Sequence, residues 1–147
     1  MRKILYLLFS CVAIITIVAC SVDKSTHHQT KYQNQSGVNI KLIGRRPYSD
    51  ENFEVQISNG KSWESKVELC PYDAGCDFSS LGLIGCDSVC IIFNEDRVLS
   101  YIYEDKSDSN PLDWRNYKKS YNKKTDVNTS LFTFTREMYD AATPIEK

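Results

Sequence analysis

Apolar and polar residues alternate along most of the chain from Ser36 onward, with the period of two that half-buried β-strands require. The pattern begins with Val38, Ile40 and Leu42, and it recurs in five further segments. It predicts strands at residues 38–42, 53–57, 63–69, 89–93, 98–103 and 131–135. In 89–93 the apolar residues fill both parities, so we expect a central strand buried on both faces, paired as a hairpin with 98–103.

Asn59 and Gly60 separate two of these strands and are a strong hairpin signal. A two-residue loop would pair Val55 with Glu64 and place the two apolar sets on opposite faces of the sheet. A three-residue loop ending at Gly60 in the left-handed conformation would instead pair Val55 with Trp63 and align both sets. We therefore expect the three-residue, bulged hairpin.

Two short helices are predicted near the C-terminus. An Asn-Pro pair at 110–111 opens the first, in which Trp114, Tyr117 and Tyr121 recur at helical spacing. The second runs over 135–142, with a threonine as N-cap and a proline two residues beyond its end. Strands and helices together predict an all-β fold, a small antiparallel β-sandwich of the immunoglobulin-like or transthyretin-like kind, with one or two short helices near the C-terminus.

The N-terminus departs from this pattern, because fifteen of the first nineteen residues are apolar. Two basic residues precede an apolar run over 4–17, which is the layout of a secretory signal and is marginal for a bilayer span of about 20 residues. The run ends in Ile-Val-Ala-Cys at 17–20, which resembles the lipobox of bacterial lipoproteins. The resemblance implies that the signal is cut before Cys20, which then carries the lipid.

These features divide the chain into four parts. We expect a cleaved lipoprotein signal peptide at 1–19, the lipidated Cys20 and a flexible tether at 20–35, a single β-sandwich domain at 36–143 and a tail at 144–147. The tether is predicted because residues 21–35 are polar apart from Val22 and Tyr32 and cannot bury a core. By analogy with lipoproteins of Gram-negative bacteria, Ser21 favours the outer membrane. Whether the domain is periplasmic or surface-exposed is left open.

Four cysteines remain in the predicted domain once Cys11 leaves with the signal and Cys20 carries lipid. They are Cys70, Cys76, Cys86 and Cys90. An even number of cysteines in an exported chain predicts disulfides. If Cys86 and Cys90 share a strand they lie about 13 Å apart, whereas a disulfide needs Cα atoms within about 7 Å. We expect Cys70 or Cys76 to bond Cys86 or Cys90. The spacing does not suit zinc, and we expect neither a metal nor a cofactor.

Charge separates into two blocks near the C-terminus, acidic at 104–113 and basic at 115–124. Without the signal the chain has 16 basic and 19 acidic side chains, so nothing favours nucleic acid as a partner. The acidic block lacks the spacing of a calcium loop. The basic block contains a candidate ligand-binding set, in which aromatic rings suit sugar faces and basic groups suit anions. Its members are Trp114, Tyr117, Tyr121, Lys118 and Lys119. Such a stripe more often docks on a sheet beside a solvated charged face.

The whole mature chain resembles a group of small, mostly uncharacterised lipoproteins of Bacteroides-type bacteria. The likeness is carried by the lipobox and by three segments, NQSGVNI at 34–40, DSVCIIF at 87–93 and FTFTREMY at 132–139. The resemblance implies an all-β, sandwich-like module with no assigned chemistry.

Function is constrained mainly by what the predicted domain lacks. Neither histidine lies within 36–143, which argues against Ser-His and Cys-His catalysis and most zinc hydrolase sites, so we expect no enzyme. The leading hypothesis is a non-enzymatic, lipid-anchored binding or structural module of the cell envelope, held by acyl chains to outer-membrane lipid. The alternative is a surface protein that binds a glycan or a host protein ligand through the aromatic and basic residues at 114–121.

Overall fold

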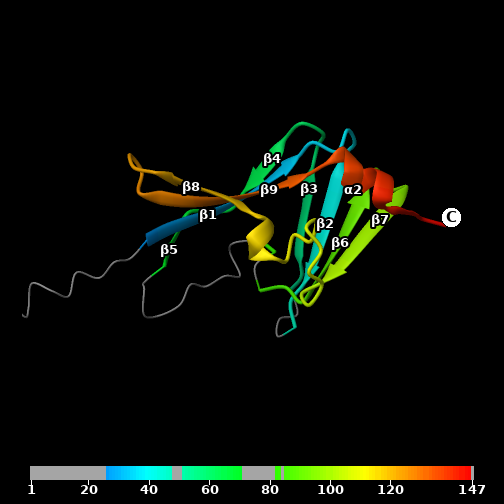
Figure 1. Cartoon of the computed structure of the whole chain (residues 1–147), viewed down its shortest axis with the longest axis horizontal. Helices are drawn as coiled ribbons and strands as arrows, with labels where there is room; N and C mark the ends of the chain where they lie inside the picture. Colours follow the sequence, from blue (N-terminus) through cyan, green and yellow to red (C-terminus); the bar gives the residue numbers. More distant parts are fainter. Residues whose placement is uncertain (1–25, 48–50, 71–81, 84, 147) are drawn as a thin grey trace, which may run out of the picture.

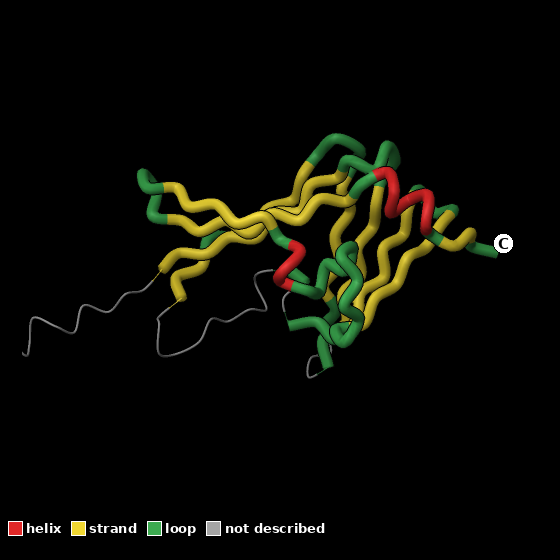
Figure 2. The backbone as a smooth tube through the Cα atoms, in the orientation of Figure 1, coloured by secondary structure: helices red, strands yellow, loops and turns green. Residues whose placement is uncertain are grey.

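The computed structural model describes residues 26–47, 51–70, 82–83 and 85–146, which form two β-sheets (Figures 1 and 2). Sheet A has the order β4-β1-β9-β8, with β5 also paired to β1, and sheet B has the order β10-β7-β6-β2-β3. The elements are β1 (Thr26–Asn34), β2 (Ile40–Arg45), β3 (Phe53–Ile57), β4 (Ser62–Glu64), β5 (Glu68–Cys70), β6 (Ser88–Phe93), β7 (Arg97–Ile102), the 3-10 helix η2 (Trp114–Asn116), β8 (Lys118–Asn122), β9 (Val127–Phe134), α2 (Arg136–Ala141) and β10 (Thr143–Pro144). The predicted all-β sandwich with a short helix near the C-terminus is confirmed.

Sheet B contains the predicted central strand. β6 lies between β2 and β7, and its hairpin with β7 has the register Phe93↔Arg97. The turn places Asn94 and Glu95 at φ values of 48° and 62°, the left-handed conformation that a tight hairpin turn requires. Val89, Ile91 and Phe93 are buried, whereas the alternate residues are half-buried, so the strand is central but fully covered on one face only.

Sheet A shows that the predicted tether is wrong for its C-terminal part. Residues 26–34 form β1, which pairs in parallel with β9 from His27↔Val127 to Asn34↔Phe134. The sandwich is therefore not wholly antiparallel, and the folded domain includes residues 26–34. Thr30, Tyr32 and Asn34 point inward and are buried. Two of these three inward residues are polar, so the segment lacks the apolar alternation that would have revealed a strand.

The predicted hairpin across Asn59 and Gly60 is also wrong. β3 pairs with β2 in sheet B, while β4 pairs with β1 in sheet A, so the chain crosses from one sheet to the other between them. The turn closes from Lys61 N to Ser58 O at 3.0 Å, which is the two-residue form. Apolar residues of β3 and β4 still face a common core, with Phe53 against Trp63 at 5.1 Å, because the two strands lie on facing sheets. Because β3 and β4 belong to different sheets, their apolar residues need not lie on the same face of one sheet, and the reason for expecting a three-residue loop disappears.

The predicted helix after 110–111 is reduced to the single turn η2, after which β8 pairs antiparallel with β9. The C-terminal helix is confirmed as α2, with Thr135 in the N-cap position and Ala142 as C-cap, but the Thr135 side chain makes no capping hydrogen bond. The predicted tail is partly wrong, because β10 joins β7 through Thr143↔Val98 and Pro144↔Arg97. None of the helices in the described ranges is long and apolar enough to span a bilayer.

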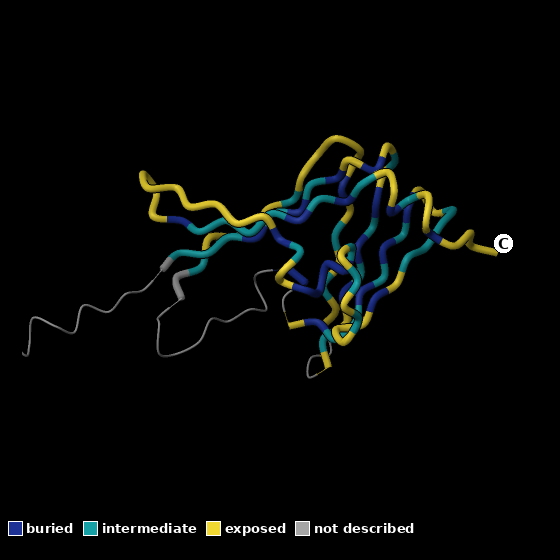
Figure 3. The backbone as a smooth tube through the Cα atoms, viewed as in Figure 1, coloured by how far each residue is buried: buried dark blue, intermediate teal, exposed yellow. Residues whose placement is uncertain are grey.

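Sheet A extends beyond sheet B on one side (Figures 1 and 3). We call this extension the arm; it comprises β5, β8 and the N-terminal halves of β1 and β9. Every residue of β8 is exposed, whereas the sandwiched end of sheet A carries the buried Tyr32, Phe132 and Phe134. These rings pack with apolar residues of sheet B in one core, so the arm is the solvated continuation of a core-forming sheet.

Candidate functional site

The inner face of sheet A changes from aromatic to polar along its length. At the sandwiched end, Tyr117 packs on Phe132 with ring centroids 5.3 Å apart, and on Tyr32 at 6.4 Å. The next cross-strand row is Lys119, Ser130 and Thr30, followed on the arm by the row Tyr121, Asn128 and His28. These rows share one face because every second residue of a β-strand points to the same side of the sheet.

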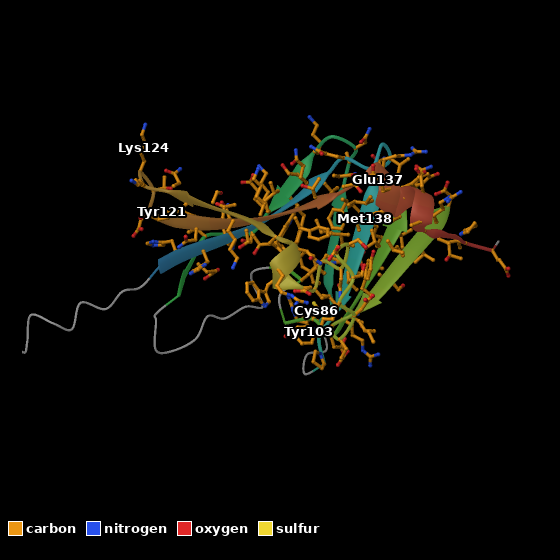
Figure 4. The ribbon with its side chains drawn as sticks, in the orientation of Figure 1. Cys86, Tyr103, Tyr121, Lys124, Glu137 and Met138 are labelled. Carbon is orange, nitrogen blue, oxygen red and sulfur yellow. The ribbon has the colours of Figure 1, made fainter. Side chains whose placement is uncertain are left out.

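A cleft of about 690 Å³ opens where the aromatic end of this face meets the loops of sheet B. Its floor includes Leu83, Cys86, Leu112 and Tyr117, which are all buried. Its rim carries two exposed rings, two carboxylates, a lysine and a serine. These are Tyr103, Trp114, Asp87, Glu104, Lys119 and Ser130. Figure 4 labels Cys86 and Tyr103 close together in this region. An apolar hollow with a few polar groups at its edge has the composition of a small-ligand site.

The rim is shaped by a buried amide. Asn110 is fully buried, and its Nδ2 donates to the carbonyls of Ile102 at 2.9 Å and Asp105 at 2.7 Å, while its Oδ1 accepts from Leu112 N at 2.9 Å. Asn116 adds a hydrogen bond from Nδ2 to Asn110 O at 3.0 Å. Asn110 thus caps a folded loop rather than the helix predicted there, and the loop holds Tyr103 and Trp114 at the cleft.

Both rim rings are open to a ligand. Trp114 is 64% exposed and Tyr103 is 55% exposed, values that leave most of each ring in solvent. A lysine ammonium lies over each ring, Lys119 Nζ at 4.3 Å from the Trp114 centroid and Lys106 Nζ at 5.6 Å from that of Tyr103. These cation–π contacts orient the rings without burying them.

The floor residues Tyr117 and Cys86, and Tyr32 packed against Tyr117, carry hydroxyl and thiol groups that stay protonated at neutral pH. Burial raises the pKa of Tyr32 to about 12, although the nearby Tyr117 hydroxyl and a hydrogen bond from Leu83 N at 2.8 Å oppose the shift. Burial also raises the pKa of Tyr117 well above its usual range, and its O–H donates to Pro111 O at 2.6 Å. The Cys86 thiol has its pKa raised by burial, against the opposing charge of Arg46. The floor is therefore neutral and presents no activated nucleophile.

The predicted ligand-binding residues are divided between two hollows. Trp114, Tyr117 and Lys119 line the cleft, while Tyr121 lies with Lys119 in a second hollow of about 400 Å³ on the arm. Lys118 lines neither hollow, and its side chain alternates with that of Lys119 along β8. Tyr117 combines both predicted roles, since it packs on the sheet and also forms the cleft floor.

Sequence reasoning missed the partners that other segments supply. Tyr103, Asp87 and Glu104 complete the cleft from the ends of β6 and β7, and no local pattern marks them as neighbours of Trp114. Only the pairing of the sheets brings these segments together.

The predicted disulfide is not observed at the two cysteines whose side chains the structure describes. Cys86 and Cys90 are free thiols. Cys86 precedes β6 and is buried in the core, whereas Cys90 lies within β6 on its half-buried outer face. The side chain of Cys70, all of Cys76, and the predicted anchor Cys20 lie outside the described residues.

The two histidines belong to the folded domain, so the premise that it contains none is wrong. His27 and His28 both lie in β1, and His28 lines the second hollow. Among the described residues, no three His, Cys, Asp or Glu side chains are placed to hold a metal ion.

No family model matches this sequence, and neither the curated proteins nor the solved structures compared with it include a match.

Proposed function

We propose that this chain is a non-enzymatic binding module, anchored by lipid at Cys20 to the outer membrane of a Gram-negative bacterium, and that its cleft binds a glycan. The observation that carries the proposal is the pairing of two exposed aromatic rings, Trp114 and Tyr103, with the carboxylates of Asp87 and Glu104 around one apolar cleft.

Sugars match this combination of groups. A pyranose ring has apolar C–H faces, which pack on aromatic rings, and hydroxyl groups at its edges, which donate to carboxylates and accept from an ammonium group. Trp114 and Tyr103 supply the ring surfaces, and Asp87, Glu104 and Lys119 supply the polar contacts. A neutral floor of tyrosine, thiol and leucine side chains excludes water beneath the sugar without adding a competing charge.

A glycan array tests the binding claim. The full chain is kept in a detergent without a sugar headgroup, so that the detergent cannot compete for the cleft. We expect binding to at least one glycan class, and a loss of tenfold or more in affinity for Trp114→Ala. Val67→Ala is the control, because Val67 is an exposed apolar residue that lines neither hollow. Absence of binding, or binding that Trp114→Ala leaves unchanged, contradicts the proposal, and release of shortened glycan contradicts a non-enzymatic role.

The anchor is tested separately in cells. A palmitate analogue is expected to label the wild-type chain and to leave Cys20→Ala unlabelled, because the predicted lipid is a diacylglyceryl group on the Cys20 sulfur together with an acyl chain on the Cys20 amino group that cleavage exposes. Unchanged labelling of the variant refutes the anchor. Protease treatment of intact cells then distinguishes a surface-exposed domain, which is degraded, from a periplasmic one, which is protected.

A further inference from the structure

We propose that the ligand is a linear glycan chain rather than a single sugar, and that the second hollow, on the arm, is a second subsite for it. The inference rests on the proposed function of the cleft and extends it. The cleft of about 690 Å³ and the arm hollow of about 400 Å³ would then form one groove along the inner face of sheet A.

The two hollows share part of their walls. Lys119 and Ser130 line both, and they form one cross-strand row between the cleft floor and the arm. Lys119 Nζ lies 4.3 Å from the centre of the Trp114 ring, so the boundary between the hollows is the same lysine that orients the cleft tryptophan. A chain leaving the Trp114 ring along the sheet would pass over this row and reach Tyr121.

The arm hollow offers the groups that a sugar needs. Tyr121, Asn128 and His28 form one cross-strand row in its lining, presenting an aromatic ring, an amide and an imidazole, and Ser120 and Thr129 of the alternate row also line it. Tyr121 is 53% exposed, and its O–H donates to Asp126 Oδ1 at 2.7 Å, which ties the ring to the adjoining turn. Lys119 and Tyr121 are two residues apart on one strand, so their side chains are separated by about 7 Å.

The same surface suits a glycan better than an extended peptide. A peptide commonly binds a sheet by adding a strand to a free edge, which needs unpaired backbone groups. The floor of the groove is formed by β8, β9 and β1, which are paired with one another, and the free edge of sheet A is the outer side of β8, beside the floor rather than on it. Recognition on the floor itself uses side chains, and the side chains present are hydroxyl, amide, imidazole, ammonium and aromatic groups.

Chain-length dependence tests the second subsite. The full chain, in the same detergent, is titrated with linear oligomers of N-acetylglucosamine, of xylose and of glucose, each from one to six units. We expect one series to bind with an affinity that rises with length. Tyr121→Ala is expected to lower the affinity for the longest oligomers about three- to tenfold and to leave that for the shortest unchanged. Tyr121→Phe keeps the ring and is expected to keep the rise.

Two neighbouring lysines provide a matched pair of variants, one a control and the other a test of the wall that both hollows share. Lys118→Ala removes an ammonium group from the opposite face of β8 and is expected to change nothing, whereas Lys119→Ala is expected to weaken both short and long oligomers. Binding that depends on Trp114 but not on length or on Tyr121 overturns the second subsite and leaves the proposed function intact. Failure of every oligomer and of the glycan array overturns both proposals, and Tyr121-dependent binding of an extended peptide overturns the glycan assignment.

Discussion

Asn34 joins the two sheets through a buried amide, and its removal is expected to destabilise the fold strongly. It ends β1 in sheet A and is fully buried. Its Nδ2 donates to the carbonyls of Val38 and Ile57, each at 2.8 Å, and Ile57 ends β3 in sheet B. Its Oδ1 accepts from Ser36 N at 3.1 Å and from Ser36 Oγ at 2.7 Å.

The size of the effect follows from the groups left behind in Asn34→Ala. The Val38 carbonyl keeps a donor in Ser36 Oγ at 3.1 Å, but the Ile57 carbonyl and Ser36 N each lose their contact with the amide in a buried site. At about 1 kcal/mol for each buried hydrogen bond, the four bonds lost with the amide, partly offset by the donor that the Val38 carbonyl keeps, amount to about 3 kcal/mol, a large part of the 5–15 kcal/mol typical of a domain.

Urea unfolding followed by far-UV circular dichroism measures this loss. With a slope of about 1.5 kcal/mol/M, a loss of about 3 kcal/mol lowers the midpoint by about 2 M. Asn39→Ala is the control, because Asn39 is exposed and its side chain accepts one hydrogen bond, from Asn59 N at 3.0 Å. We expect that control to lose less than about 1 kcal/mol. Equal midpoints for the two variants would refute the inter-sheet role of Asn34.

Three further predictions concern the cleft and its loops. Gly82→Ala is expected to lose about 3 kcal/mol of unfolding free energy, because φ is +82° and the new Cβ would lie 2.7 Å from the Tyr32 ring. Gly60→Ala has a similar φ of +71° but open space around it, so it is expected to lose about 1 kcal/mol. Equal losses of the two variants in thermal unfolding would contradict this difference. The pKa of Tyr32 is about 12 in the fold against 10.0 for the free side chain, so the stability that Tyr32 contributes is present below pH 10 and is lost as the pH rises to about 12. Tyr32→Phe should flatten the decline in urea midpoint over that range, and an unchanged slope would count against the shift. Hydrogen bonding from Arg115 lowers the pKa of Asp113 to about 2, so the stability that Asp113 contributes is present above pH 4 and is lost as the pH falls toward 2. The urea midpoint of Asp113→Asn should therefore decline less steeply than that of the wild type between pH 4 and pH 2.

The strands that follow an apolar alternation were predictable from the sequence, and β1 was not. In β2 and β6 the buried positions hold isoleucine, leucine, valine and phenylalanine, together with Gly44, and in the C-terminal half of β9 they hold Phe132 and Phe134, so the period of two is visible there. In β1 the buried positions hold Thr30, Tyr32 and Asn34, and residues outside the strand satisfy their polar groups: Ser65 Oγ accepts from Thr30 N at 2.9 Å, and Leu83 N donates to the Tyr32 hydroxyl at 2.8 Å. A polar strand of this kind becomes recognisable only when its partners are known.

The candidate site was predictable in its aromatic residues but not in its geometry. Trp114, Tyr117 and Tyr121 fit a helical spacing, yet Tyr117 and Tyr121 also fit a strand, because residues four apart share a face in both. Pairing of β8 with the β-branched and aromatic β9 selects the strand. That choice moves Lys118 away from the site and brings Lys119 to its centre.

Because a single face of sheet A forms both the core and the proposed groove, position along that face determines what a substitution can reveal. Tyr117 contributes to the cleft floor, but it is buried against Phe132, so its loss would weaken folding and binding together. Trp114 and Tyr121 are exposed, so their removal leaves the core packing in place. Lys119 lies between these cases, on the polar row that follows the last buried aromatic row. The groove residues that can separate binding from stability are therefore Trp114 on the rim and the residues in the rows beyond Tyr117, and the affinity changes of Trp114, Lys119 and Tyr121 variants should occur at unchanged urea midpoints.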